Sequence, residues 1–93
     1  MEREAVRLVI EGKVQGVGYR WWAVGEAMRQ GLNGWVRNRA DGTVEALAIG
    51  PQDAIARFER ACWRGPGGAR VIAVTRLEAE DDASQGFSQR PTL

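Results

Sequence analysis

Two kinds of apolar pattern alternate along this chain of 93 residues, and their order restricts the fold more than any other feature. Four segments have the alternating or β-branched pattern of strands, and two carry apolar residues at helical spacing. Their order is strand, helix, strand, strand, helix, strand. We expect strands over Ala5–Gly12, Asn33–Arg39, Thr43–Gly50 and Arg70–Glu78, and helices over Arg20–Gln30 and from about Pro51 to Arg64.

This order predicts an α+β fold of the ferredoxin-like split β-α-β type (βαββαβ). In it, an antiparallel sheet carries two helices on one face, and we expect the other face to be exposed to water. Gly31 is placed to end the first helix, and Asp41-Gly42 favours a tight hairpin between the second and third strands. A short extra strand is expected from Phe87. Residues 1–93 suffice for a single domain.

Composition excludes several kinds of chemistry. The chain has no histidine, which excludes a Ser-His-Asp triad, a histidine base and a histidine-ligated metal. Its one cysteine, Cys62, excludes an internal disulfide and fits a reducing cytoplasm. A net charge of +1 gives no reason to expect nucleic-acid binding. We find neither an apolar run long enough to span a membrane nor a secretory signal, and therefore expect a cytoplasmic protein.

A glycine loop joins the first strand to the first helix, and it has the features of an anion cradle. Gly16 and Gly18 permit backbone conformations in which successive N–H groups face one point, and Arg20 opens the helix with a guanidinium fork. Trp21 stands where a dinucleotide loop needs a small residue, and no Gly-Lys-Ser/Thr triplet of a Walker A loop occurs. A cradle for one phosphate-sized group remains, with an unliganded tight turn as the alternative.

Asn38 is a second candidate for the site, at the end of the strand that precedes the hairpin. On its own it is more typical of a turn-former, because asparagine readily hydrogen-bonds its own backbone at such positions. It becomes a catalytic candidate only if its strand lies beside the glycine loop. The split β-α-β order permits this arrangement, because the first and second strands flank the same helix.

Taken together, these segments closely resemble the acylphosphatase family over nearly the whole chain. The resemblance rests on Gly12–Arg20, Gly31–Asn38 and Asp41–Ala46, and continues through Gly50, Phe58, Gly65-Pro66, Ala69 and Val71. It implies hydrolysis of the carboxyl–phosphate bond of small acyl phosphates, with inorganic phosphate as product or inhibitor. The family uses neither a metal nor an organic cofactor, and small size favours a monomer.

The resemblance also assigns roles to individual residues. Arg20 would bind the phosphate and Asn38 would orient the attacking water. The phosphate oxygens would be wrapped by backbone N–H groups of the loop, from Gln15, Gly16, Val17, Gly18, Tyr19 and Arg20. The chemistry is compatible with these residues, because an acyl phosphate has a good leaving group and needs mainly positioning and charge stabilisation.

Two other functions are compatible with parts of the pattern. The same domain occurs at the front of larger carbamoyl-transfer maturation proteins, so it could be a non-catalytic module for phosphate or carbamoyl phosphate. The end of the chain at Leu93 favours a free-standing enzyme instead. An RNA-recognition motif shares the element order but needs exposed aromatics on its central strands, and Thr43–Gly50 and Arg70–Glu78 contain none.

Three aromatic residues beside the loop leave further questions open. Tyr19 stands where the family usually has phenylalanine, so its hydroxyl needs water or a protein partner. Trp21 and Trp22 could either cover the cradle or pack on the helix.

Overall fold

The predicted order of elements is confirmed in the computed structural model, which describes residues 3–93. Met1 and Glu2 of the predicted domain lie outside the described residues. The elements differ from the expected bounds by one residue or less at most ends. They are β1 (Glu4–Lys13), α1 (Tyr19–Arg29), β2 (Asn33–Asn38), β3 (Val44–Gly50), α2 (Gln52–Arg64), β4 (Arg70–Glu78) and β5 (Phe87–Gln89).

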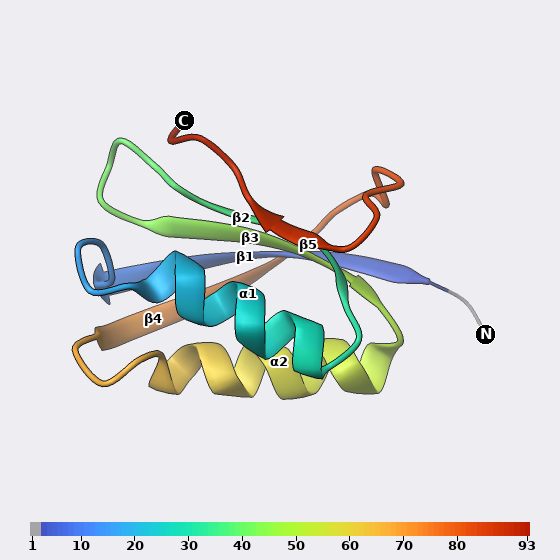
Figure 1. Cartoon of the computed structure of the whole chain (residues 1–93), viewed down its shortest axis with the longest axis horizontal. Helices are drawn as coiled ribbons and strands as arrows, with labels where there is room; N and C mark the ends of the chain where they lie inside the picture. Colours follow the sequence, from blue (N-terminus) through green and yellow to red (C-terminus); the bar gives the residue numbers. More distant parts are fainter. Residues whose placement is uncertain (1–2) are drawn as a thin grey trace.

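The strands form one sheet in the order β4-β1-β3-β2-β5, and both helices cover the same face of it (Figure 1). The pairs β1–β4, β1–β3 and β2–β3 are antiparallel, which confirms the predicted ferredoxin-like arrangement. The short β5 adds a parallel pairing with β2, so the complete sheet is mixed. Because β3 lies between β1 and β2, these two strands run in the same direction on either side of it.

The main core lies between the sheet and the two helices, and the alternation in β1 places Val6, Leu8 and Ile10 in it. On α2 the residues at helical spacing are all buried, with Ile55 and Phe58 fully enclosed. Burial of such side chains contributes about 1.5–3 kcal/mol each. No helix within residues 3–93 has the length and apolar content needed to cross a membrane.

Local signals set the ends of α1 and the hairpin as expected. Gly31 has a φ of 71°, and the N–H of Leu32 donates to the Ala27 carbonyl at 3.0 Å, which is a Schellman ending. The hairpin closes through the Arg39 N–H, which donates to the Thr43 carbonyl at 2.9 Å.

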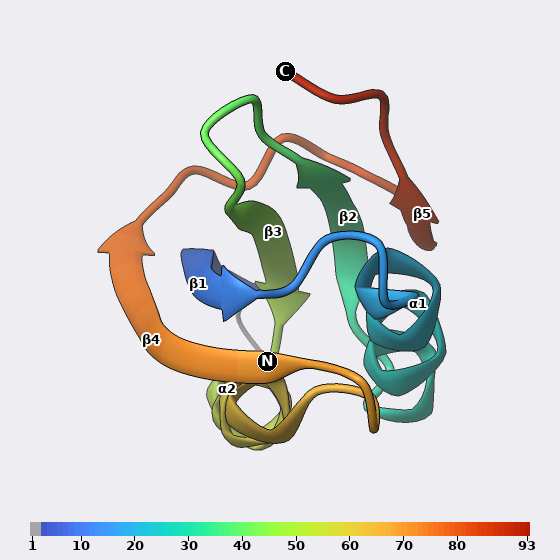
Figure 2. The ribbon, with the colours of Figure 1, turned by 90° about the vertical axis from the view of Figure 1, so that its left-hand side faces the viewer.

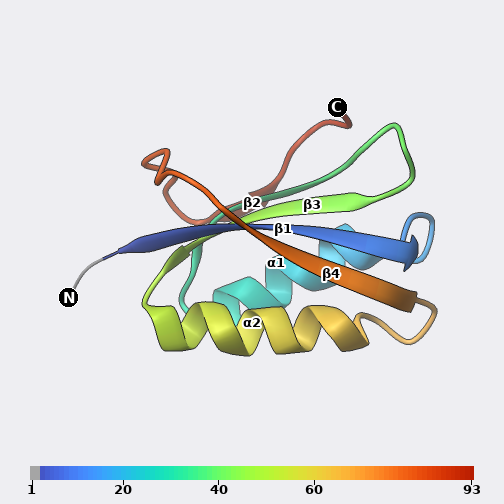
Figure 3. The ribbon, with the colours of Figure 1, turned by 180° about the vertical axis from the view of Figure 1, so that it is seen from behind.

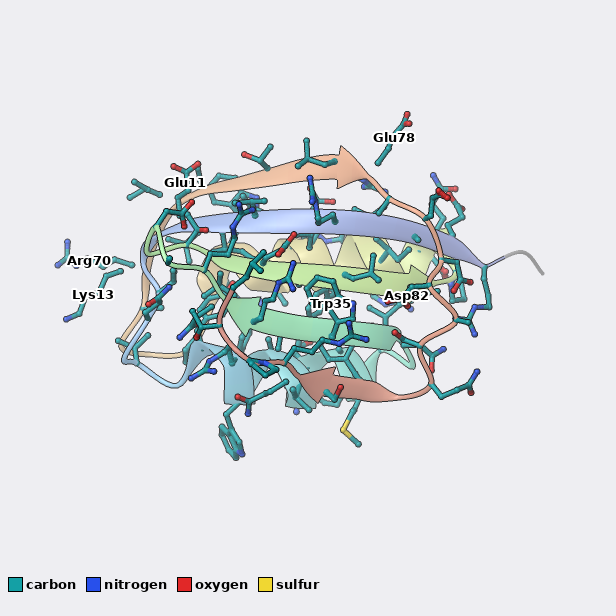
Figure 4. The ribbon with its side chains drawn as sticks, turned by 90° about the horizontal axis from the view of Figure 1, so that it is seen from above. Glu11, Lys13, Trp35, Arg70, Glu78 and Asp82 are labelled. Carbon is teal, nitrogen blue, oxygen red and sulfur yellow. The ribbon has the colours of Figure 1, made fainter. Side chains whose placement is uncertain are left out.

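The sheet face opposite the helices is partly covered, which corrects the expectation that water covers it. Trp35, Leu47 and Ile49 form a second apolar cluster there, with Ala79 packed against it. The segment between β4 and β5 crosses one end of this face and brings Asp82 to Trp35 (Figure 4), whose indole N–H donates to the Asp82 carboxylate at 3.2 Å. The return of the chain from one sheet edge to the other thus supplies the cover.

Candidate active site

The loop between β1 and α1 leaves a run of backbone N–H groups without protein acceptors. Gly16 and Gly18 have φ values of 76° and 79°, in the left-handed region that favours glycine. Gly18 is the N-cap of α1, with neither a side-chain cap nor an acidic residue in the first turn. Within residues 3–93, the N–H groups of residues 15–21 donate to no protein acceptor. A loop and helix start of this kind favour an anion electrostatically.

A pocket of about 140 Å³ opens at this loop. Its size suits one small group, since pockets for larger ligands occupy roughly 300–1,000 Å³. Figure 2 shows the converging elements: the loop after β1, the start of α1 and the end of β2 beside the hairpin. The residues that line the pocket are Val14, Gln15, Gly16, Gly18, Tyr19, Arg20, Trp21, Asn38 and Gln89.

Arg20 lies in the first turn of α1 and brings a positive charge to the pocket. Within residues 3–93 its guanidinium makes neither an ion pair nor a side-chain hydrogen bond, although many other arginines do. For example, Arg37 pairs with Glu45 at 2.8 Å and Arg76 with Glu59 at 2.9 Å. The fork of Arg20 is therefore free to bind two oxygens of an anion.

Asn38 ends β2 and lines the same pocket, as the split β-α-β order permitted. Within the described residues its side-chain amide makes no hydrogen bond, so it does not act as the turn-former considered from the sequence. Asp41 has that function instead: its carboxylate accepts the Thr43 N–H at 3.0 Å and the Thr43 hydroxyl at 2.7 Å. These bonds from Thr43 hold the pKa of Asp41 below its usual value.

Gln15 ties the loop to the hairpin. Its side-chain amide donates to the Arg39 carbonyl at 2.8 Å and to the Thr43 carbonyl at 2.9 Å. The donor group of this side chain is thus engaged, and the backbone N–H of Gln15 is the donor left for an anion. The same two bonds fix the glycine loop relative to the strand end that carries Asn38.

Tyr19 is one of the residues that line the pocket, and its side chain is buried in the core. The ring is 2% exposed and packs edge-to-face on Trp22 with centroids 5.3 Å apart. The hydroxyl donates to the Cys62 carbonyl at 2.6 Å. That carbonyl cannot be satisfied within α2, because the residue four positions later is Pro66, which has no N–H. Burial raises the pKa of Tyr19, so the phenol stays protonated.

The structure gathers most of the predicted site residues and adds others. Val17 does not line the pocket; its side chain packs against the main core and lies beside Gly68 in the loop between α2 and β4. This loop and the glycine loop lie at the same end of the molecule (Figure 3). Gln89 was missed because its place depends on β5 pairing with β2, for which the sequence near Gln89 gives no signal. The sequence allows Trp21 either to cover the cradle or to pack on the helix; in the structure it is 76% exposed and lines the pocket wall.

Comparisons with known proteins agree with this geometry. The family model described as Acylphosphatase matches residues 6–89. An acylphosphatase of Rhodospirillum rubrum is 56% identical, with 90% of this chain and 92% of that protein covered. The crystal structure of acylphosphatase from Bacillus subtilis has a TM-score of 0.89 and 37% identity, and covers 92% of this chain and 97% of that one.

One structural neighbour is far larger. The crystal structure of full-length HypF in the phosphate- and nucleotide-bound form has a TM-score of 0.90 and 25% identity. The likeness covers 98% of this chain but 12% of HypF. Both the extent of the family match and the identity to curated relatives lead to one conclusion: the chain belongs to the acylphosphatase family.

Proposed function

We propose that this chain hydrolyses small acyl phosphates in the pocket between the glycine loop and the end of β2. Arg20 and the backbone N–H groups of residues 15–20 bind the phosphate oxygens, and the amide of Asn38 holds a water in line with the leaving group. The observation that carries the proposal is that one pocket joins a guanidinium, a run of N–H groups and an amide that find no protein partner among residues 3–93.

In the proposed step, the water oxygen bonds to phosphorus while the bond from phosphorus to the bridging oxygen breaks. The acyl group leaves as a carboxylate, and the water proton passes to solvent or to a phosphate oxygen. Because the carboxylate is a good leaving group, the protein needs to place the water and to stabilise charge on the phosphoryl oxygens. A neutral amide at Asn38 does this without the repulsion that a carboxylate would add.

The reaction as proposed uses no metal or organic cofactor, which accords with a site made of arginine, amide and backbone groups. We also propose that the protein works as a monomer in the cytoplasm. The support for that compartment is a single cysteine, Cys62, which is buried and for which burial raises the pKa to about 12, so it is an unreactive thiol.

The test is hydrolysis of benzoyl phosphate with EDTA present, in the wild type and in variants at the two proposed catalytic residues. Removing a preorganised donor costs roughly 10²–10³ in rate. We expect Arg20→Ala to lose at least this much in kcat/KM and to weaken inhibition by phosphate. Asn38→Ala should lose a similar factor in kcat while phosphate inhibition changes little, because its amide acts on the water.

Arg60→Ala is the matched control, since Arg60 is an exposed arginine on α2 that does not line the pocket. Near-normal turnover by Arg20→Ala or Asn38→Ala would remove that residue from the mechanism. The likeness to part of HypF favours a second candidate, a binding module for phosphate or carbamoyl phosphate. A wild type that binds inorganic phosphate in calorimetry but hydrolyses no acyl phosphate would favour that module.

A further inference from the structure

A second depression continues along the side of α1 from the pocket at the glycine loop, which we call the phosphate pocket after its proposed function. It has a volume of about 300 Å³ and is lined by Trp21, Trp22, Val24, Gly25, Met28, Arg29 and Gln89. We call it the α1 groove. Trp21 and Gln89 line both the groove and the phosphate pocket, so the two depressions share a wall. The groove runs between α1 and β5, which lie side by side in Figure 2.

The groove presents large apolar side chains to solvent. Trp21 is 76% exposed and Met28 is 64% exposed, whereas most apolar residues of the sheet and of α2 are buried. Trp21, Gly25 and Met28 are spaced four and three residues apart, so they lie on one face of the helix. An aromatic ring and a flexible thioether are side chains that adapt to apolar ligands of varied shape.

Gly25 keeps the middle of this face open. A Cβ built on it would meet no atom within 4 Å, so packing does not require a glycine there. Its φ is an ordinary helical one, so backbone conformation does not require one either. Glycine inside a helix is less favourable than alanine, because more backbone freedom is lost on folding. The helix thus carries a destabilising residue at the point where a side chain would fill the groove.

We propose that the α1 groove binds the acyl group of the substrate, and that this chain prefers acyl phosphates with aromatic or extended apolar acyl groups. The inference rests on the proposed function. In an acyl phosphate the acyl carbon is one oxygen away from phosphorus, so a bound phosphate directs the acyl group out of the pocket. The shared wall of Trp21 and Gln89 leads it into the groove.

The dimensions of the groove agree with such a group. Met28 is seven positions after Trp21, which corresponds to roughly 10 Å along a helix. A benzoyl group fits within that length, whereas an acetyl group ends near Trp21. The two tryptophans differ in position: Trp22 packs on Tyr19 and lines the α1 groove alone, whereas Trp21 lines both the groove and the pocket.

The experiment compares kcat/KM for benzoyl phosphate with that for acetyl phosphate. We expect the wild type to favour benzoyl phosphate by about tenfold or more, since burying an aromatic group in an apolar groove is favourable. Gly25→Leu fills the groove and should reduce this ratio about tenfold, mainly through KM for benzoyl phosphate. Trp21→Ala should reduce it similarly. Trp63→Ala is the matched control, because Trp63 is 49% exposed on α2, away from both depressions, and should leave the ratio unchanged.

A binding measurement separates failure of the subsite from failure of the proposed function. Benzoylphosphonate and methylphosphonate are non-hydrolysable probes, and their dissociation constants are measured by calorimetry for the same variants. Tighter binding of benzoylphosphonate that Gly25→Leu abolishes supports the subsite, even if the wild type hydrolyses neither substrate. Hydrolysis with equal ratios in the wild type, Gly25→Leu and Trp21→Ala would overturn the subsite and leave the proposed function standing.

A second copy of the chain is the competing occupant of such an apolar surface. Sedimentation over a range of protein concentrations tests for it. A dimer that Trp21→Ala dissociates, together with an unchanged selectivity ratio, would overturn the acyl subsite and assign the groove to a protein interface.

Discussion

At the scale of single residues, Tyr19 shows how one side chain can join the pocket region to the core. Tyr19 lines the pocket at the glycine loop, while its hydroxyl donates to the Cys62 carbonyl near the end of α2. Pro66 removes the N–H that would ordinarily bond this carbonyl. The hydroxyl thus replaces a missing helical hydrogen bond, which explains how tyrosine is accommodated where the family usually has phenylalanine.

Tyr19→Phe is expected to destabilise the protein because the Cys62 carbonyl loses its donor in a buried place. Leaving a buried acceptor unsatisfied costs about 1–3 kcal/mol of the free energy of unfolding. Urea unfolding followed by circular dichroism measures the loss. Trp22→Phe is a control for the aromatic contact alone. If Tyr19→Phe has the same free energy of unfolding as the wild type, the hydrogen bond from the Tyr19 hydroxyl contributes nothing to stability.

At the scale of elements, β2 has the most demanding position, because it pairs with β3 on one side and β5 on the other while ending at Asn38. Gly34 makes this packing possible. Its φ is 132°, and a Cβ built on it would lie 1.8 Å from the Leu47 carbonyl oxygen on β3. Its N–H donates to the Gly86 carbonyl at 2.9 Å, just before β5. Only glycine permits both approaches at this point.

Gly34→Ala is expected to push β2 away from β3 and to displace Asn38. The strained φ and the clash together correspond to a loss of about 3 kcal/mol in unfolding free energy. Thermal unfolding and kcat for benzoyl phosphate both report the change. Gly25→Ala is a control with the same substitution at an open helical position, where stability should rise by about 1 kcal/mol. Equal changes in unfolding free energy for Gly34→Ala and Gly25→Ala would contradict the proposed need for glycine at position 34.

At the scale of the whole molecule, ionisable groups in several elements together define the pH range of stability. Hydrogen bonds hold the pKa values of four carboxyls below their usual range. The donors are Arg29 to Glu26, Thr43 to Asp41, the Ala83 N–H to Asp81 and Ser84 to Asp82. Two other acidic groups shift in the opposite direction: burial raises the pKa values of the Tyr19 phenol and the Cys62 thiol.

The directions of these pKa shifts predict a loss of stability at both extremes of pH. Carboxyls with lowered pKa stabilise the fold above their unfolded values, 4.5 for Glu26 and 3.8 for Asp82, and this is lost as pH falls through the folded values. Cys62, raised from 9.0 to about 12, stabilises the fold below pH 9.0, and this is lost as pH rises toward 12. Thermal midpoints should therefore peak between about pH 5 and pH 9.

One variant for the acid range and one for the alkaline range identify the groups responsible for each loss of stability. Asp82→Asn should give a shallower fall in the thermal midpoint toward acid, and Tyr19→Phe a shallower fall toward alkali. A midpoint that rises above pH 9 would contradict the assigned burial of Cys62 and Tyr19.

Features that depend on interactions between residues close together in the chain could be predicted from the sequence, whereas features that depend on distant residues could not. Gly16, Gly18 and Arg20 predict an anion site because loop and helix-start chemistry is local, and the Asp41-Gly42 turn is local too. The order of elements and the family's motifs are likewise written along the chain. By contrast, the engaged side chain of Gln15 and the fit of Tyr19 to Cys62 depend on partners 24 to 43 residues away.

The sequence by itself therefore determined the element order, the fold class and most of the residues that line the pocket at the glycine loop. Only the tertiary structure decided that β5 joins β2, that Gln89 and Trp21 form the shared wall, and that Trp35 is covered by the segment leading to β5. The physical reason is that turn and helix-end preferences act between near neighbours in the chain. Pairing at a sheet edge and the lining of a groove arise only when distant segments pack together.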